Sequence, residues 1–272
     1  PSSDSTWYRI AYFKIGRPIT TGNRCWTRYA SDALVITADG IIPMSKAVQI
    51  DRAMSVSLTD KIRTIFTSDF VAHSAKFGWS MTLHPAGNKL VLNVPTEADV
   101  SARQYVMNLK TGAWCRFTGW NAFSWEVQRD VLYFGGDGIL VKADSGLGDD
   151  GVAVQADAKQ AFSYFGARGQ QKKFTLMRPV LAIDGEIQLG LDINMDYADA
   201  APSSTITINS GGGDPWSVAW DVAWGGASTI YRAWHSIRGV GFAAAARLRV
   251  QSEDVRVSWS ASDFSWEGGG LL

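Results

Sequence analysis

The three histidines and two cysteines are the residues best suited to metal or nucleophilic chemistry, and their spacing supports neither. His73, His84 and His235 have no cysteine or carboxylate at the spacing of a zinc site. Cys25 and Cys115 stand apart, without a CxxC pair or a cysteine–histidine cluster. We therefore expect surface or hydrogen-bonded structural histidines and buried structural thiols.

The glycine-rich and acidic segments also lack the motifs of known catalytic, phosphate-binding or calcium-binding sites. The sequence has no GxSxG motif, no P-loop and no GxGxxG after a strand-like run. Residues 211–215 lack the lysine and helix of a phosphate cradle, so we expect a flexible loop there. Residues 144–151 combine three aspartates with glycines, but not at the spacing of a known calcium loop. A solvated loop is favoured there over calcium, and we predict no cofactor and no metal.

Carboxylates and aromatic residues leave sugar chemistry open. A glycosidase needs two carboxylates across the sugar, and the candidates are Glu126, Glu186, Asp192 and Asp196. Nothing in the sequence shows that two of them converge. The 12 Trp, 12 Phe and 8 Tyr could stack on sugars, or could pack sheets and subunit interfaces. Packing is the favoured interpretation, and no catalytic residue is assigned.

Residues 219–234 are the best candidate for a contact between subunits. They bring together Trp220, Trp224 and Trp234 with Arg232. Trp, Tyr and Arg dominate the residues that contribute most to binding at protein interfaces. An ordinary hydrophobic core would explain the same residues nearly as well.

Composition sets the broad class. Among 272 residues, 26 Lys and Arg balance 26 Asp and Glu, which argues against nucleic-acid binding by bulk electrostatics. The chain is 46% apolar and 19% charged, so it is globular, and its many aromatic and glycine residues favour sheets. No apolar run is long enough for a membrane span. Because the sequence begins with Pro1 and not Met, we expect part of a longer chain.

An internal repeat is the strongest structural signal. Residues 32–42 align without gaps on residues 130–140, an offset of 130 − 32 = 98 residues, and each copy has an Asp-Gly pair between two apolar runs. Such pairs are typical of hairpins with a type I′ turn. Residues 79–94 and 104–117 predict two further strand pairs between the copies. Two units of about 49 residues fit four-stranded propeller blades.

A short helix interrupts these strands. Residues 58–70 place Ile62, Ile65 and Phe66 on one helical face, after cap candidates Thr59 and Asp60. We expect the helix to fill a groove in the sheet assembly, with contact to a neighbouring subunit as the alternative.

The chain becomes polar and rich in glycine after residue 144, which predicts a boundary near residues 145–172 and a second module beyond it. We expect blade-like sheets over residues 1–150 and a C-terminal antiparallel sandwich or platform over residues 151–272. Within the second module, Asp184-Gly185 predicts a hairpin between residues 174–182 and 186–196. Residues 205–208 predict a short strand, and residues 244–250 and 255–260 predict a closing pair of strands.

One segment resembles a known family. Residues 104–120, QYVMNLKTGAWCRFTGW, are similar to a segment of tail nozzle or hub (tail tubular) proteins of short-tailed double-stranded DNA bacteriophages. An LYFG strand, an acidic glycine loop and Arg178-Pro179 follow here as they do there. The ending over residues 259–270 also resembles such proteins, and the resemblance spans residues 80–272.

The resemblance implies a non-enzymatic virion protein of the phage tail. Such a protein forms a ring, expected to be a hexamer, below the portal and adaptor proteins, and carries tail fibres or spikes. DNA would pass through the ring without specific binding, which zero net charge allows. The alternatives are a carbohydrate-binding or carbohydrate-cleaving tail component and a general scaffold for protein partners.

Overall fold

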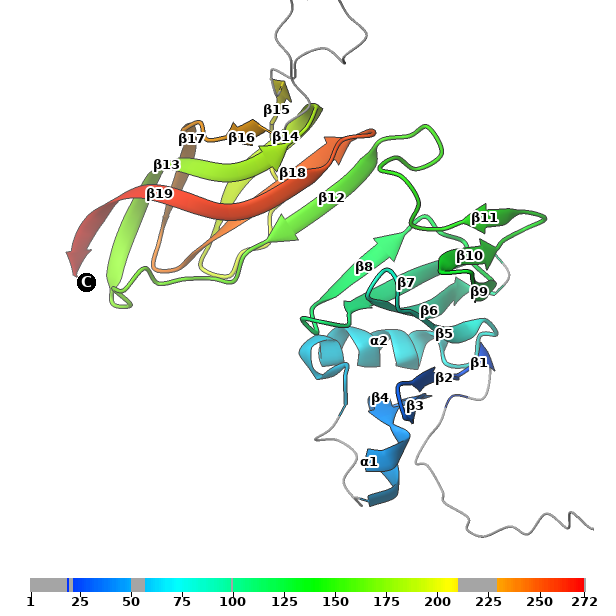
Figure 1. The fold of residues 1–272 in the computed structure, drawn as a ribbon. Coiled ribbons are helices and arrows are strands. Elements are labelled where there is room, and N and C mark those ends of the chain that lie inside the picture. Colours follow the sequence, from blue (N-terminus) through cyan, green and yellow to red (C-terminus); the bar gives the residue numbers. More distant parts are fainter. Residues whose placement is uncertain (1–18, 20–21, 50–56, 99, 210–228, 272) are drawn as a thin grey trace, which may run out of the picture. The chain divides into compact units, whose positions relative to one another are not determined.

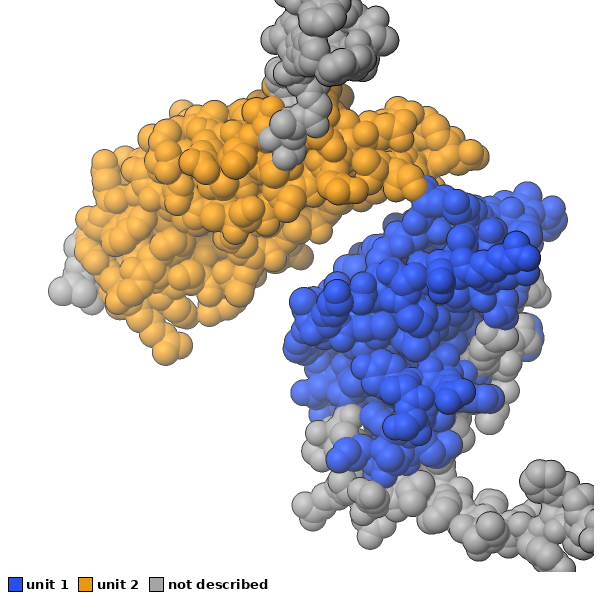
Figure 2. All heavy atoms as spheres, viewed as in Figure 1, with its two compact units in different colours: residues 1–145 blue, residues 146–272 orange. Residues whose placement is uncertain are grey.

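The computed structural model describes residues 19, 22–49, 57–98, 100–209 and 229–271. The chain divides into two compact units, residues 1–145 and residues 146–272, shown in different colours in Figure 2. The division lies close to the predicted module boundary. Strands make up 58% and helices 8%, so the predicted all-β class is confirmed.

Unit 1 is organised around a five-stranded sheet, which we call the central sheet. Its order is β1-β5-β6-β7-β8, and the last four strands form an antiparallel meander (Figure 1). The strand pairs expected over residues 79–94 and 104–117 are confirmed as β5–β6 and β7–β8. The strands are β1 (Gly22–Arg24), β5 (Trp79–His84), β6 (Lys89–Glu97), β7 (Ser101–Asn108) and β8 (Trp114–Thr118).

The repeat corresponds to two three-stranded antiparallel meanders. The first begins at residue 26 and the second at residue 124, which reproduces the offset, 124 − 26 = 98. The first consists of β2 (Trp26–Tyr29), β3 (Asp32–Thr37) and β4 (Gly40–Pro43). The second consists of β9 (Ser124–Gln128), β10 (Val131–Gly135) and β11 (Leu140–Lys142).

The expected type I′ turns at the two Asp-Gly pairs are wrong. Gly40 pairs with Thr37, so it belongs to the strand ladder and not to the centre of the turn. Gly138 has a φ of 68°, but the aspartate before it has no positive φ, as a type I′ turn requires. Positive φ at both central residues occurs instead at Arg129 (50°) and Asp130 (62°), between β9 and β10.

The two meanders pack on opposite faces of the central sheet. Alternation along β6 sends Leu90 and Leu92 into a core with β3 and β4, and Val91 into a second core with β9 and β10. The central meander thus lies between two similar meanders, face to face. The expected four-stranded blades are not seen among the described residues, because the three sheets of unit 1 have three, five and three strands.

The predicted helix is a 3-10 turn, η2 (Asp60–Ile62), followed by α2 (Arg63–His73). Phe66 and Phe70 pack on Trp79, with ring centroids 6.4 and 6.1 Å apart, so α2 covers the central sheet. Two details differ from expectation. Ile65 is exposed, and Thr59 makes no side-chain cap because its hydroxyl bonds to Ser57. A second short helix, α1 (Met44–Gln49), follows β4.

Unit 2 is a sandwich of two antiparallel sheets. The first, which we call the β12 sheet, has the order β12-β18-β14-β15, and the second joins β16 and β17 to one side of β13 and β19 to the other. Figure 1 shows the long β13 and β19 side by side. The strands are β12 (Val154–Lys159), β13 (Gln170–Ile183), β14 (Glu186–Met195), β15 (Thr205–Asn209), β16 (Thr229–Tyr231), β17 (His235–Gly241), β18 (Ala244–Ser252) and β19 (Val257–Leu271).

Two predicted pairings in this unit are wrong. The strands on either side of Asp184-Gly185, β13 and β14, lie in different sheets, so this segment is a corner of the sandwich and not a hairpin. The expected closing pair likewise divides, with β18 in one sheet and β19 in the other. Both places have the sequence pattern of a hairpin, in which a polar turn separates two apolar runs. In each, however, the turn connects strands of two different sheets. Among the described helices, none has the length and apolar character needed to cross a bilayer.

Candidate subunit-contact surface

The β12 sheet has one face in the core of the sandwich and one polar outer face. Ile187, Leu189 and Leu248 alternate into the core. Side chains alternate between the two faces of a strand, so Arg247 and Arg249, on either side of Leu248, point to the outer face. This outer face carries the densest set of charges that the structure describes in unit 2.

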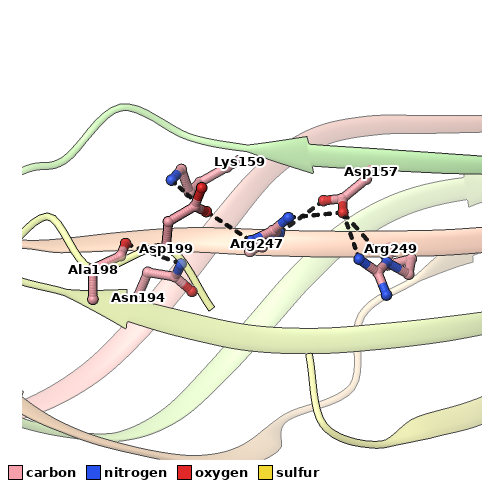
Figure 3. Close-up of polar contacts among 7 residues, drawn as sticks. All are labelled: Asp157, Lys159, Asn194, Ala198, Asp199, Arg247 and Arg249. Carbon is pink, nitrogen blue, oxygen red and sulfur yellow. Dashed lines mark hydrogen bonds and ion pairs between the residues drawn. The ribbon is translucent and has the colours of Figure 1, made fainter. Parts of the chain in front are cut away.

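Five charged side chains form a connected network on that face, drawn in Figure 3. Arg247 binds both carboxylate oxygens of Asp157 at 2.9 Å and reaches Asp199 at 2.8 Å. Asp157 also accepts from Arg249 at 2.9 Å, and Lys159 donates to Asp199 at 2.9 Å. The network ties β12 to β18 and to the segment after β14.

The network lowers the affinity of its carboxylates for protons. Hydrogen bonds from Arg247 are the main reason that the pKa of Asp157 falls to about 2, despite some desolvation. The pKa of Asp199 is also lowered, chiefly by its hydrogen bond to Lys159. Both carboxylates are therefore ionised at neutral pH, and both are bound by cationic side chains of the same sheet.

Among the described residues, each end strand of the β12 sheet has a side without a strand partner. Every residue of β12 is exposed, including Val154, which points to the core side but is 41% exposed. At the other end, β15 reads Thr-Ile-Thr-Ile-Asn, with no charge and no proline, and its register with β14 has no bulge. In the part of the chain that the structure describes, each strand pairs on one side only.

The histidines have structural surroundings. A ring nitrogen of His84 lies 3.0 Å from the Asp130 carbonyl oxygen, and one of His235 lies 2.8 Å from the Tyr231 hydroxyl. Burial lowers the pKa of both His73 and His235. Among the described residues, no three His, Cys, Asp or Glu side chains lie close enough to hold a metal.

The cysteines differ from each other. Cys25 is half-buried and packs against the core of unit 1. The expectation of a buried thiol is wrong for Cys115, which is exposed because β8 is the end strand of the central sheet. Its Sγ lies 3.5 Å from the Val106 carbonyl oxygen on β7.

The candidate glycosidase carboxylates of unit 2 lie along one strand, β14, or just after its end. Glu186 begins β14 and Asp196 follows its end. Ten residues of strand separate their backbones by roughly 33 Å, far beyond the spacing of glycosidase acids. Asp192 bonds to the next backbone N–H at 2.8 Å, and Asp196 accepts from the N–H groups of Phe242 and Ala243. Glu126 lies on β9 in the other unit.

An ion pair and two backbone hydrogen bonds hold the acidic loop of residues 144–151. Asp144 forms an ion pair with Lys89. Asp149 and Val152 exchange backbone hydrogen bonds of 2.9 and 3.0 Å, which closes the loop. Residues 211–215 lie outside the described residues.

The tryptophans are mainly packing residues where the structure describes them. Trp79 and Trp125 are buried in the two cores of unit 1. Of the predicted contact region, Trp220 and Trp224 lie outside the described residues. Trp234 is 46% exposed, and the Arg178 guanidinium lies 4.8 Å from its ring centroid.

Sequence reasoning did not identify the charged network. The signal was present as Asp157 and Lys159, two residues apart, and as Arg247 and Arg249, also two apart. In strands this spacing places both members on one face. That β12 and β18 are neighbours could not be deduced, because residues 160–243 lie between them.

No protein-family model matches the chain, and no curated protein matches it significantly.

Proposed function

We propose that this chain is a structural subunit of a phage tail, without enzymatic activity, that assembles with copies of itself into a ring. In this proposal the ring, of six copies, lies below the portal and adaptor proteins, attaches tail fibres or spikes, and forms the conduit for the genome. The phage assignment rests on the resemblance of residues 104–120, which include most of β7, the turn after it and all of β8.

The observation that carries self-assembly is that, within the described residues, β12 and β15 each pair with another strand on one side only. Exposed strand edges readily pair with other chains, and monomeric proteins usually protect them with charges, prolines or bulges. β15 has none of these. A ring requires two different complementary patches on each subunit, and one sheet with two open ends offers two.

Large apolar side chains exposed in unit 1 add contact area. Leu140 is 76% exposed and lies beside Ile139, which is 60% exposed, at the tip of the second meander. Val71 on α2 is 76% exposed. Clusters of exposed apolar side chains often mark protein contacts. The expected contact of this helix with a neighbouring subunit thus stays a prediction.

One pocket described in unit 1 is too small for a typical ligand. The pocket beside Phe77 and Phe123 holds about 40 Å³, room for a few water molecules. Ligand pockets typically measure several hundred Å³. For the carbohydrate alternative, the candidate binding groups are exposed aromatic rings such as Trp26, which is 60% exposed.

The proposal is tested with purified protein and with particles. Electron microscopy of the full chain should show rings, and antibodies against the protein should label the tail end of virions. A strict monomer that never enters particles would contradict the proposal. Binding on a glycan array, abolished by Trp26→Ala, would favour the carbohydrate alternative instead.

A further inference from the structure

The four strands of the β12 sheet alternate in direction from one end to the other. β12 runs antiparallel to β18, β18 to β14, and β14 to β15. The two end strands, β12 and β15, therefore run in opposite directions. A second copy placed beside the first in the same orientation brings its β12 antiparallel to β15, so the ladder continues without a change of pattern.

The second sheet of the sandwich lacks this property. β17 and β19 both pair antiparallel with β13, so its end strands run in the same direction. Copies added in the same orientation would there meet as parallel strands. Of the two sheets, therefore, only the β12 sheet would continue as an antiparallel ladder from one copy to the next.

The side chains of the two end strands match face by face. On the core side, Val154 of β12 is 41% exposed and Ile206 of β15 is 36% exposed. Ile206 pairs with the core residue Leu189, and Val154 pairs with Ser252, yet both apolar side chains stay partly exposed. Pairing the strands would bring these apolar groups together on one side.

The outer side of the joint is compatible as well. Thr205 and Thr207 of β15 are uncharged and exposed. The charges of β12, Asp157 and Lys159, already have partners in their own subunit. Covering β12 with a neighbour would therefore leave no unpaired charge at the joint, which otherwise carries a large cost. The strands also have similar lengths, six and five residues.

We propose that copies of this chain join by pairing β15 of one subunit with β12 of the next, which makes one continuous sheet across the interface. This inference rests on the proposed function, because it supplies the contact for self-assembly. The interface is heterologous: each subunit uses one patch on each side, and the rotation per subunit decides whether a ring closes.

The test is cross-linking between two single-cysteine proteins. Both carry Cys25→Ala and Cys115→Ser; one adds Gln155→Cys on β12 and the other adds Thr207→Cys on β15 with a larger tag. A short bismaleimide is added to each protein alone and to the mixture. We expect mixed dimers in at least about tenfold excess over dimers of either protein alone, as a heterologous joint requires.

A control places the cysteine on the other sheet. Ser260→Cys on β19 is exposed and should give few cross-links with either partner. Light scattering on every sample reports assembly independently of cross-linking. Assembly with mixed dimers supports the joint. Assembly with same-strand dimers, or with no cross-links, overturns the joint and leaves the proposed self-assembly standing. Monomers at all concentrations contradict the proposed function itself.

Discussion

The hydroxyl of Tyr105 donates a hydrogen bond of 2.5 Å to Oδ2 of Asp69, joining β7 of the central sheet to helix α2. Both residues are buried, and Arg103 reaches the other carboxylate oxygen at 3.4 Å. Burial, and then the hydrogen bond to Asp69, raise the pKa of Tyr105 above its ordinary value. The contact fixes α2 on the sheet face that also receives the first meander.

Breaking this contact should destabilise unit 1. Asp69→Ala leaves the Tyr105 hydroxyl buried without an acceptor, so we expect a loss of about 1–3 kcal/mol in the free energy of unfolding. Urea unfolding of Asp69→Ala, Tyr105→Phe and the double variant measures the coupling, which we expect at about 1 kcal/mol. Strictly additive losses would show that the hydrogen bond contributes nothing.

The charged network of unit 2 should make its stability depend on acid pH. Because the pKa of Asp157 is about 2 when folded, below its ordinary value of 3.8, folding favours the ionised form. That stabilisation is fully present above about pH 4 and is lost as the pH falls through about 2. Asp157→Asn should flatten the fall in urea midpoint over this range. An unchanged pH profile in the variant would rule out this role.

Lys172 is buried, has no carboxylate partner among the described residues, and should be essential to the sandwich. Its ammonium group donates to the carbonyl oxygens of Ala167 (2.5 Å), Gln170 (2.9 Å) and Phe242 (3.1 Å), and lies 5.9 Å from the Trp266 ring centroid. Lys172→Met keeps the apolar stem but removes the donor, so we expect a loss of about 2–4 kcal/mol. The exposed neighbour gives the control, Lys173→Met. Equal stability of the two variants would contradict the prediction.

The corner at Gly185 should not tolerate a side chain. A Cβ there would lie 2.5 Å from Cγ2 of Val255, so we expect Gly185→Ala to cost about 1–3 kcal/mol. At Gly169 nothing lies within 4 Å of the added atom, and Gly169→Ala should leave thermal unfolding unchanged. Similar melting temperatures for the two variants would contradict the close approach at the corner.

Local pattern predicted the strands better than it predicted their partners. The spacing of apolar residues located β5 to β8, and the repeat located both flanking meanders, because hairpin partners are close in sequence. The same pattern failed at Asp184-Gly185, where the chain crosses to the other sheet. A turn signal shows that the chain reverses. Which sheet receives the next strand depends on packing against distant residues such as Val255.

The candidate surface could be predicted only in part. A tryptophan-rich region and an inserted helix were visible as patterns, but the unpaired sides of β12 and β15 follow from strand order among the described residues. β12 and β18 are paired across residues 160–243, and the sequence carries no local signal for such a pairing. The sequence of β15 predicts a strand, but its lack of charge matters for pairing with another subunit only because β15 lies at the end of the sheet.

The most direct measurement is the mass of the purified full chain by light scattering across a concentration series, with electron microscopy of the same samples. The account predicts a discrete oligomer that appears as closed rings, and a shift toward monomers when Thr207 on β15 is replaced by proline while the unfolding transition remains cooperative. A particle that stays at the monomer mass of 29.6 kDa at every concentration would contradict it.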